Sequence, residues 1–263
     1  MTNYKKINGI KVSYKINLTD SDIYLIFIHG LQTRKEAFEF YETRLKNELN
    51  YCTLSIDLVG FGETDKPPKF SYDLSSQVKI LISLLSALKI EKIIIIGHSF
   101  GGMIGNYLLD YDIEILSFIN LEGNMTLSDC GESLNVDNMT FESFKPYYNN
   151  LIRELDNSDE SAMKFRASSL KMIPNFVFYA SSKTIVKWSK SSYLYDKFIN
   201  QKLPKMLIIG EKSGYSTRPD DNYTTIKTVP KTSHFMFLEE KEKTLQLLLD
   251  FLNDCANFNQ YIQ

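Results

Sequence analysis

One stretch near the middle of the chain constrains the fold more than any other: a run of isoleucines followed by a serine between glycines. Residues 92–96 read Lys-Ile-Ile-Ile-Ile, and residues 97–101 read Gly-His-Ser-Phe-Gly. A β-branched run that is apolar on both faces is typical of a buried parallel strand. Residues 103–109 then carry apolar side chains at helical spacing. The pattern places Ser99 on a sharp turn from a strand into a helix.

This context predicts that Ser99 is a nucleophile. A turn this tight strains the serine backbone and requires residues without a Cβ two positions before and two after it, which Gly97 and Gly101 provide. The hydroxyl would stand above the sheet, and the Phe100 amide at the positive end of the helix would point to a developing oxyanion. The alternatives are a junction that only packs tightly or one that binds phosphate. No Lys-Ser/Thr pair follows the glycines, which argues against a phosphate loop.

The composition fits one globular domain with an insertion. The 263 residues are 43% hydrophobic and carry a formal net charge of −2, which argues against nucleic acid as a partner. The three cysteines are widely spaced and match no metal pattern, so reduced thiols are expected. The first residues lack an apolar signal segment, and no apolar run reaches membrane length. We therefore expect a cytoplasmic protein without membrane insertion.

Apolar runs and turn signals predict alternating strands and helices. The predicted strands are residues 4–7, 11–17, 23–28, 52–56, 92–96, 115–121, 205–209 and 223–229. The predicted helices are residues 33–49 with Thr33 as the cap, 71–88, 103–109, 193–200 and 239–256. Asn8-Gly9 marks a hairpin that joins the first two strands at one edge. Alternation of this kind indicates a mostly parallel sheet with helices on both faces.

The alternation lapses between residues 125 and 189, which are helical in character. Their aromatic side chains recur at regular spacing: Phe141, Phe144, Tyr147, Tyr148, Phe165, Phe176, Phe178, Tyr179 and Trp188. Such a stripe is more often core than binding pocket. We expect residues 125–189 to form an inserted helical cap over the carboxyl edge of the sheet, where ligands of α/β proteins bind. Residues 1–124 and 190–263 would then form the core.

Four motifs in this order resemble the α/β-hydrolase fold family, specifically its lid-bearing branch of serine hydrolases and esterases. They are His29-Gly30, the Asp-x-x-Gly-x-Gly pattern of residues 57–62, the strand-to-helix turn at 97–102 (the nucleophile elbow), and the Ser-His-Phe stretch 233–235. The resemblance spans nearly the whole chain. It implies an eight-stranded, mostly parallel sheet with helices on both faces and a helical lid. It also implies that His234 is the general base for Ser99, and serine chemistry independently requires such a base.

The resemblance also implies two backbone donors for the oxyanion, the amides of Leu31 and Phe100. Of the three histidines in the chain, His29 and His98 would be structural or would line the pocket.

The acid of the triad departs from the common family pattern. The expected aspartate position, in the stretch Gly-Glu-Lys-Ser of residues 210–213, holds Ser213. A minority arrangement takes the acid from the end of the sixth strand, and Glu122 is there. A carboxylate in either loop could orient the histidine ring. We favour Glu122 as the acid. Glu211 is the alternative, and Asp220 and Asp221 are less favoured candidates.

A serine nucleophile argues against dehalogenase and epoxide hydrolase chemistry, which need a carboxylate nucleophile, and leaves acyl transfer. The predicted reaction is cleavage of a small-to-medium apolar carboxylic ester, thioester or lactone through an acyl-enzyme on Ser99, with no metal or organic cofactor. One alternative is C–C bond hydrolysis or a hydroxynitrile-lyase-like reaction on the same residues. Another is a non-catalytic protein that binds a small molecule, which the serine at position 213 supports.

Overall fold

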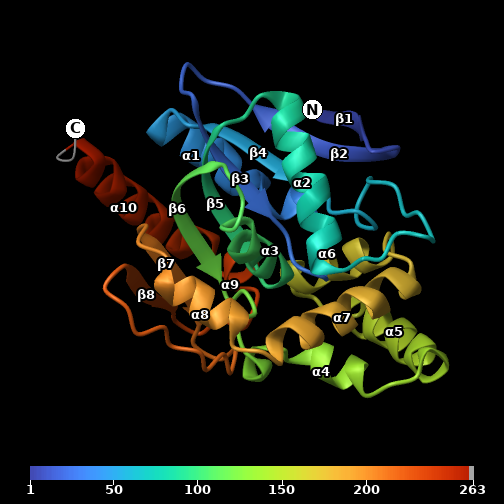
Figure 1. The fold of residues 1–263 in the computed structure, drawn as a ribbon. Helices are drawn as coiled ribbons and strands as arrows, with labels where there is room; N and C mark the ends of the chain where they lie inside the picture. The colour runs from blue at the N-terminus through green and yellow to red at the C-terminus, as the bar shows by residue number, and fades with distance from the viewer. Residues whose placement is uncertain (261–263) are drawn as a thin grey trace.

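A computed structural model describes residues 1–260 and has an eight-stranded sheet at its centre (Figure 1). Its strands are β1 (Thr2–Ile7), β2 (Ile10–Asn17), β3 (Ile23–Ile28), β4 (Cys52–Ile56), β5 (Lys92–His98), β6 (Glu114–Leu121), β7 (Lys205–Gly210) and β8 (Thr224–Val229). They lie in the order β1-β2-β4-β3-β5-β6-β7-β8. Only β2 pairs antiparallel, with β1 and with β4, and the remaining pairs are parallel. The prediction of a mostly parallel eight-stranded sheet is therefore confirmed.

The predicted hairpin also forms at one edge of the sheet. Asn8 and Gly9 have φ values of 48° and 85°, as the two central residues of a tight hairpin turn require. Asparagine and glycine adopt such values at low cost, which explains why this pair joins β1 to β2.

The isoleucine run of β5 lies between two hydrophobic cores. Ile93 and Ile95 belong to the core on one face of the sheet, and Ile94 and Ile96 belong to the core on the other. Alternate side chains of a strand point to opposite faces, so a strand covered on both sides needs apolar residues throughout. This arrangement explains the absence of polar alternation in the run.

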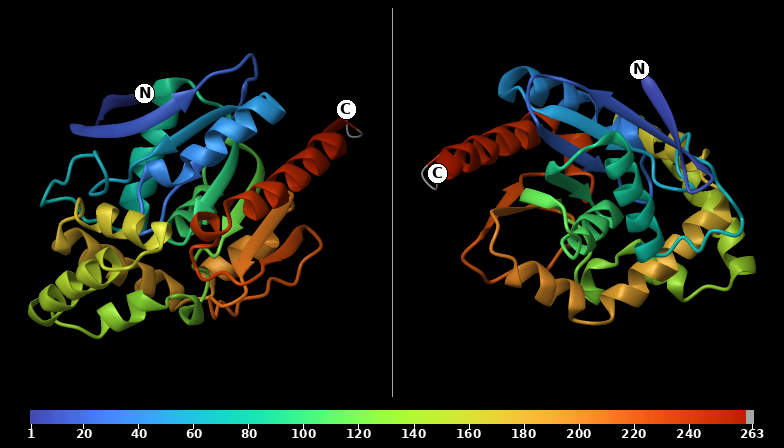
Figure 2. Two further views of the ribbon diagram at one scale, coloured as in Figure 1. Left: turned by 180° about the vertical axis from the view of Figure 1, so that it is seen from behind. Right: turned by 45° about the horizontal axis from the view of Figure 1, so that its top comes forward.

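Helices cover both faces of the sheet (Figures 1 and 2). One face packs against α1 (Glu39–Leu49) and α10 (Lys241–Gln260), and the other against α2 (Leu74–Leu88), α3 (Phe100–Leu108) and α8 (Tyr193–Asn200). The short helix α9 (Met236–Glu239) precedes α10. None of the helices in residues 1–260 combines the length and apolar character that a membrane span requires.

Three predicted helix starts are wrong. The helix predicted from residue 103 begins at Phe100, as α3. Thr33 does not cap a helix, because its hydroxyl donates instead to the Gly30 carbonyl at 3.4 Å, and a 3₁₀ helix (Lys35–Phe38) precedes α1. The helix predicted from residue 71 begins at Leu74, because Asp73 accepts a hydrogen bond from the Ser76 amide at 2.7 Å and caps it.

The segment between β6 and β7 contains most of the remaining helices. They are a 3₁₀ helix (Leu127–Asp129), α4 (Glu132–Asp137), α5 (Phe141–Asp156), α6 (Ser161–Leu170) and α7 (Asn175–Ser189). These helices gather at one end of the sheet (Figures 1 and 2). Phe144, Tyr148 and Phe178 are buried among them, with ring centroids 5.1 to 5.9 Å apart. These three members of the aromatic stripe form a core that joins α5 to α7.

Candidate active site

Ser99 lies in the turn between β5 and α3, as the sequence predicts. Its backbone has φ 52° and ψ −117°, a conformation that is strained for a residue with a side chain. Close contacts explain the glycines around it. A Cβ on Gly97 would lie 2.5 Å from the Gly101 carbonyl oxygen, and a Cβ on Gly101 would lie 2.0 Å from the Ile28 carbonyl oxygen. The turn can therefore form only where both positions lack a side chain.

These contacts predict a large loss of stability for Gly101→Ala. The added methyl group would meet backbone of β3, which cannot move without disturbing the sheet, so the free energy of unfolding should fall by about 3 kcal/mol. Urea denaturation measures the change. Gly9→Ala is the control, because Gly9 also has positive φ but a Cβ there would meet nothing within 4 Å. It should lose about 1 kcal/mol. Equal losses in the two variants would contradict the steric explanation.

His29 fixes the peptide that precedes Leu31. Its Nε2 accepts a hydrogen bond from the Leu58 amide at 3.1 Å, so the proton of the neutral ring is on Nδ1, which donates to the Gly30 carbonyl at 2.8 Å. Burial lowers the pKa of His29 and favours this neutral form. Because a trans peptide directs its N–H opposite to its C=O, the bond to the Gly30 carbonyl also sets the direction of the Leu31 amide.

Leu31 and Phe100 are the two predicted oxyanion donors. Leu31 lines a cavity that also contains Ser99, and Phe100 is the first residue of α3. Within residues 1–260, neither backbone amide donates a hydrogen bond to another protein group. The first amides of a helix have no partner inside it, and the amide of Phe100 is therefore free to bind an anion.

His234 is held by Glu122. The His234 Nδ1 lies 2.6 Å from Glu122 Oε2, and Glu122 Oε1 accepts a hydrogen bond from the Gly210 amide at 2.7 Å. Glu122 is 1% exposed and has φ 47°, an uncommon value for a residue other than glycine. An ionised carboxylate only accepts hydrogen bonds, so Nδ1 carries the proton and Nε2 of the neutral ring is left without one. That nitrogen can act as a base.

The other predicted acids lie elsewhere. Glu211 is exposed and accepts a hydrogen bond from the Lys231 amide at 2.7 Å, and Asp220 is also exposed. Asp221 binds the Tyr223 amide and the Thr224 hydroxyl, each at 2.7 Å. Ser213 lines the cavity, and its Oγ accepts a hydrogen bond from the Tyr215 amide at 3.1 Å. Of these carboxylates, only that of Glu122 is bonded to the His234 ring.

His98 joins the serine turn to the histidine loop. Its Nε2 donates to the His234 carbonyl at 3.0 Å, and the two rings lie 4.7 Å apart between centroids. Burial is the main cause that holds the pKa of His98 well below its usual value. A neutral ring that donates from Nε2 leaves Nδ1 unprotonated, and this atom has no partner among the described residues.

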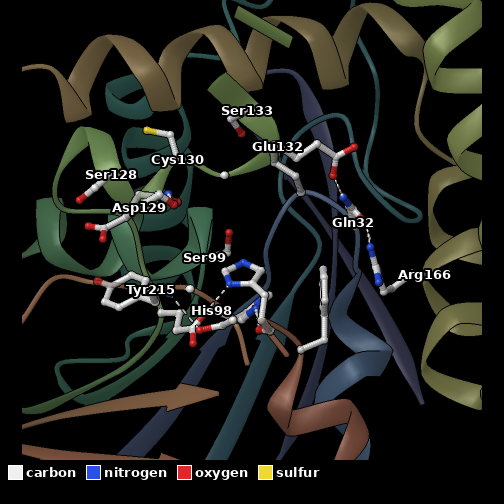
Figure 3. Close-up of a pocket in the computed structure, with 18 of the residues that line it drawn as sticks. Gln32, His98, Ser99, Ser128, Asp129, Cys130, Glu132, Ser133, Arg166 and Tyr215 are labelled. Atoms are coloured by element: carbon white, nitrogen blue, oxygen red, sulfur yellow. Dashed lines mark hydrogen bonds and ion pairs between the residues drawn. The ribbon is translucent and has the colours of Figure 1, made fainter. Parts of the chain in front are cut away.

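Ser99 and His234 line one cavity of about 270 Å³, and Ser99 directs its hydroxyl toward the side formed by Cys130, Glu132 and Ser133 (Figure 3). Within the described chain, the structure records no hydrogen bond between this hydroxyl and the His234 ring. Catalytic hydrogen bonds often tighten only when substrate binds.

The cavity walls combine polar and apolar side chains. The polar side chains include Gln32, Asn124, Asp129, Glu132 and Arg166, and carbon surface comes from residues such as Leu31, Phe178 and Phe235. Phe178 is the only member of the aromatic stripe that lines the cavity. The aromatic stripe as a whole therefore does not form the wall of the cavity. Sequence reasoning missed Glu132 and Arg166, because nothing in helical spacing distinguishes a polar residue that faces a cavity from one that faces solvent.

Comparison with known proteins places this fold and these motifs in a family. A family model described as "alpha/beta hydrolase fold" matches residues 24–155, half of the chain. A Bacillus subtilis protein, provisionally named 2-succinyl-6-hydroxy-2,4-cyclohexadiene-1-carboxylate synthase, is 24% identical over 254 residues, covering 87% of this chain and 89% of that protein.

Solved structures share the fold at lower identity. A carboxylesterase structure from Nitrososphaera gargenis has a TM-score of 0.80 at 16% identity and covers 98% of this chain and 99% of its own. An esterase from Exiguobacterium antarcticum has a TM-score of 0.78 at 16% identity, with coverages of 96% and 100%. The match of the family model over half of the sequence, on the sheet and elbow described above, shows that this chain belongs to the α/β-hydrolase fold family.

Proposed function

We propose that this protein is a serine hydrolase that cleaves small carboxylic esters, thioesters or lactones through an acyl-enzyme on Ser99. The observation that carries the proposal is the 2.6 Å bond between His234 Nδ1 and Glu122, in the same cavity as a serine on a strained turn. This bond fixes the tautomer in which Nε2 can accept the serine proton. A histidine that served only the fold would not need a buried carboxylate to fix its tautomer beside a cavity.

The reaction would proceed in two acyl-transfer steps. His234 Nε2 takes the proton of the Ser99 hydroxyl as Oγ bonds to the carbonyl carbon, and the amides of Leu31 and Phe100 donate to the oxyanion. The tetrahedral intermediate collapses when His234 returns the proton to the leaving alcohol, thiol or ring oxygen. Water, deprotonated by His234, then attacks the acyl carbon; the bond from the acyl carbon to Ser99 Oγ breaks, His234 returns the proton to Oγ, and the acid is released. Glu122 stabilises the imidazolium that forms in each step.

Residues 125–189 act in this proposal as a cap that supplies part of the cavity wall. Glu132, Arg166 and Phe178 come from this segment, while Ser99, Glu122 and His234 come from the core. A cavity of about 270 Å³ with polar and apolar walls fits a small substrate that carries a polar substituent. Two similar structures are described as esterases, which supports ester chemistry.

A fluorophosphonate probe tests the proposal, because it reacts with an activated serine. We expect stoichiometric labelling of the peptide that contains Ser99, detected by mass spectrometry. Ser213→Ala is the matched control, because Ser213 lines the same cavity but lies outside the elbow. It should keep the label. Absence of labelling in the folded wild-type protein would contradict the proposal and favour a non-catalytic binding protein.

A panel of p-nitrophenyl esters of rising chain length, together with lactones, then defines the substrate. Turnover should be highest for short acyl groups, because the cavity is small. Labelling of Ser99 without turnover of any ester, thioester or lactone would contradict the ester proposal and favour C–C bond cleavage on the same residues.

A further inference from the structure

The side chain of Gln32 connects the loop of the proposed oxyanion hole to two cap helices. Its Oε1 accepts hydrogen bonds from Arg166 Nε at 2.9 Å and Nη2 at 2.5 Å, and its Nε2 donates to Glu132 Oε2. Arg166 comes from α6 and Glu132 from α4, so one amide bonds to two cap elements at once. Figure 3 shows this row of three side chains along one wall of the cavity.

The amide of Gln32 lies between opposite charges. Within residues 1–260 the structure records no direct ion pair between Arg166 and Glu132, and each of them binds one end of the Gln32 amide instead. Burial lowers the pKa of Arg166 to about 10, so its guanidinium remains charged at neutral pH. Burial also raises the pKa of Glu132, while hydrogen bonds from Tyr147 and Gln32 oppose that rise. Hydrogen bonds to charged groups are stronger than neutral ones, and the Gln32 amide bonds to both of these charged side chains.

The backbone around Gln32 makes this link relevant to the oxyanion hole. Leu31 and Gln32 are the central residues of a turn closed by a hydrogen bond from the Thr33 amide to the Gly30 carbonyl, with a length of 3.3 Å. A bond of this length is beyond the usual range, so His29 holds the Gly30 carbonyl on one side of the turn while the Thr33 side is only weakly constrained. Gln32 is only 7% exposed, and its side-chain bonds restrict the rotation of the turn residue that follows the Leu31 amide.

Arg166 also contacts the histidine loop. Its guanidinium lies 3.9 Å from the ring centroid of Phe235, the residue after His234. A cation over an aromatic face is attracted by the ring, and this attraction strengthens when the pair is partly desolvated. One cap side chain therefore touches the residue next to Leu31 and the residue next to His234.

We propose that Gln32 is a positioning residue that acts together with His29 to hold the Leu31 amide in its oxyanion-binding direction, and that Arg166 and Glu132 of the cap hold Gln32. The proposal rests on the function proposed above. It makes the geometry of the oxyanion hole depend on contacts made by the cap. Binding of the ground-state substrate should depend on them less, because the oxyanion forms only in the transition state.

The test is a comparison of Gln32→Met with Arg34→Met. Methionine matches the length of glutamine but has neither the acceptor nor the donor. We expect Gln32→Met to lower kcat for the best ester about 20-fold, less than the roughly 10²–10³-fold effect of losing a donor completely, with little change in KM. Arg34 lies in the same loop and binds Ser168 and Ser169 of α6, and within residues 1–260 the structure records no hydrogen bond between it and Gln32. Arg34→Met should keep kcat near the wild-type value.

A charge-conserving exchange provides the rescue. In the double variant Gln32→Glu with Glu132→Gln, the carboxylate at position 32 can accept from Arg166 and from the amide at position 132, while Tyr147 can still donate to that amide. The single variant Gln32→Glu places two carboxylates side by side and should have a lowered kcat. The double variant should recover most of kcat. Denaturation midpoints identify any variant that has lost its fold. Among folded variants, a higher kcat in the double variant than in Gln32→Glu supports the positioning role, and an equally low kcat contradicts it.

The outcomes separate this proposal from the function on which it rests. If the wild-type protein neither reacts with fluorophosphonate nor hydrolyses esters, the proposed function itself is contradicted. An active wild type whose Gln32→Met variant keeps its kcat overturns only the positioning role. Equal losses of kcat in Gln32→Met and Arg34→Met would also overturn it, since any break between the loop and α6 would then have the same effect.

Discussion

Ser99→Ala is expected to lower kcat/KM for the best ester by about 10⁶-fold, the scale found when a serine nucleophile is removed. Without Oγ no acyl-enzyme can form, and the residual rate would come from substrate binding and the backbone donors. The variant should fold normally, because alanine is smaller than serine and meets the same backbone strain at φ 52°. Hydrolysis is measured spectrophotometrically, and the fold is checked by the denaturation midpoint.

A folded Ser99→Ala variant that kept most of its activity would remove Ser99 from the reaction. Ser128, Ser133 and Ser213 also line the cavity and would then be the next nucleophiles to substitute.

Glu122→Gln is expected to lower kcat about 10⁴-fold while leaving the fold intact. The wild-type carboxylate accepts from both His234 Nδ1 and the Gly210 amide. An amide offers only one oxygen, so its NH₂ group must face one of these two donors. If it faces the histidine, the ring adopts the tautomer in which Nε2 carries the proton and cannot accept one from Ser99. Steady-state kinetics and the denaturation midpoint measure the two effects.

Glu211→Gln is the matched control for this substitution. Glu211 is the alternative acid, and it is exposed and bound to the Lys231 amide rather than to the histidine. Its replacement should change kcat by no more than about twofold, as for an ordinary surface position. If Glu211→Gln were the severely impaired variant and Glu122→Gln were near normal, the assignment of the acid would be reversed.

The elbow could be predicted because its residue pattern follows from its backbone geometry. A side chain on Gly97 would meet the turn itself, one on Gly101 would meet the neighbouring strand β3, and the isoleucines before the turn are buried on both faces of the sheet. The Thr33 cap failed for a related reason. A threonine before a helical pattern can bond forward to the helix or back to the chain, and here it bonds back to Gly30.

Identifying the acid and the residues of the cavity walls required the tertiary structure, because both are set by packing between distant segments. Strands β6 and β7 are neighbours, so the loops that carry Glu122 and Glu211 follow adjacent strands, and the sequence left both open. The hydrogen bonds of Glu122 to His234 and Gly210 distinguish them. Arg166 and Glu132 could not be found from sequence, since they come from separate helices, α6 and α4, whose packing sets which side chains face the cavity.

The bond from His98 to the carbonyl of His234 joins the two segments that carry Ser99 and His234. The loop that carries His234 is tied twice, through its ring to Glu122 and through its backbone to the serine turn. Neither tie uses Ser99 Oγ or His234 Nε2, so in the proposed reaction both ties can persist while these two atoms exchange a proton. The serine turn and the histidine loop are therefore held together independently of the helices between β6 and β7 that line the rest of the cavity.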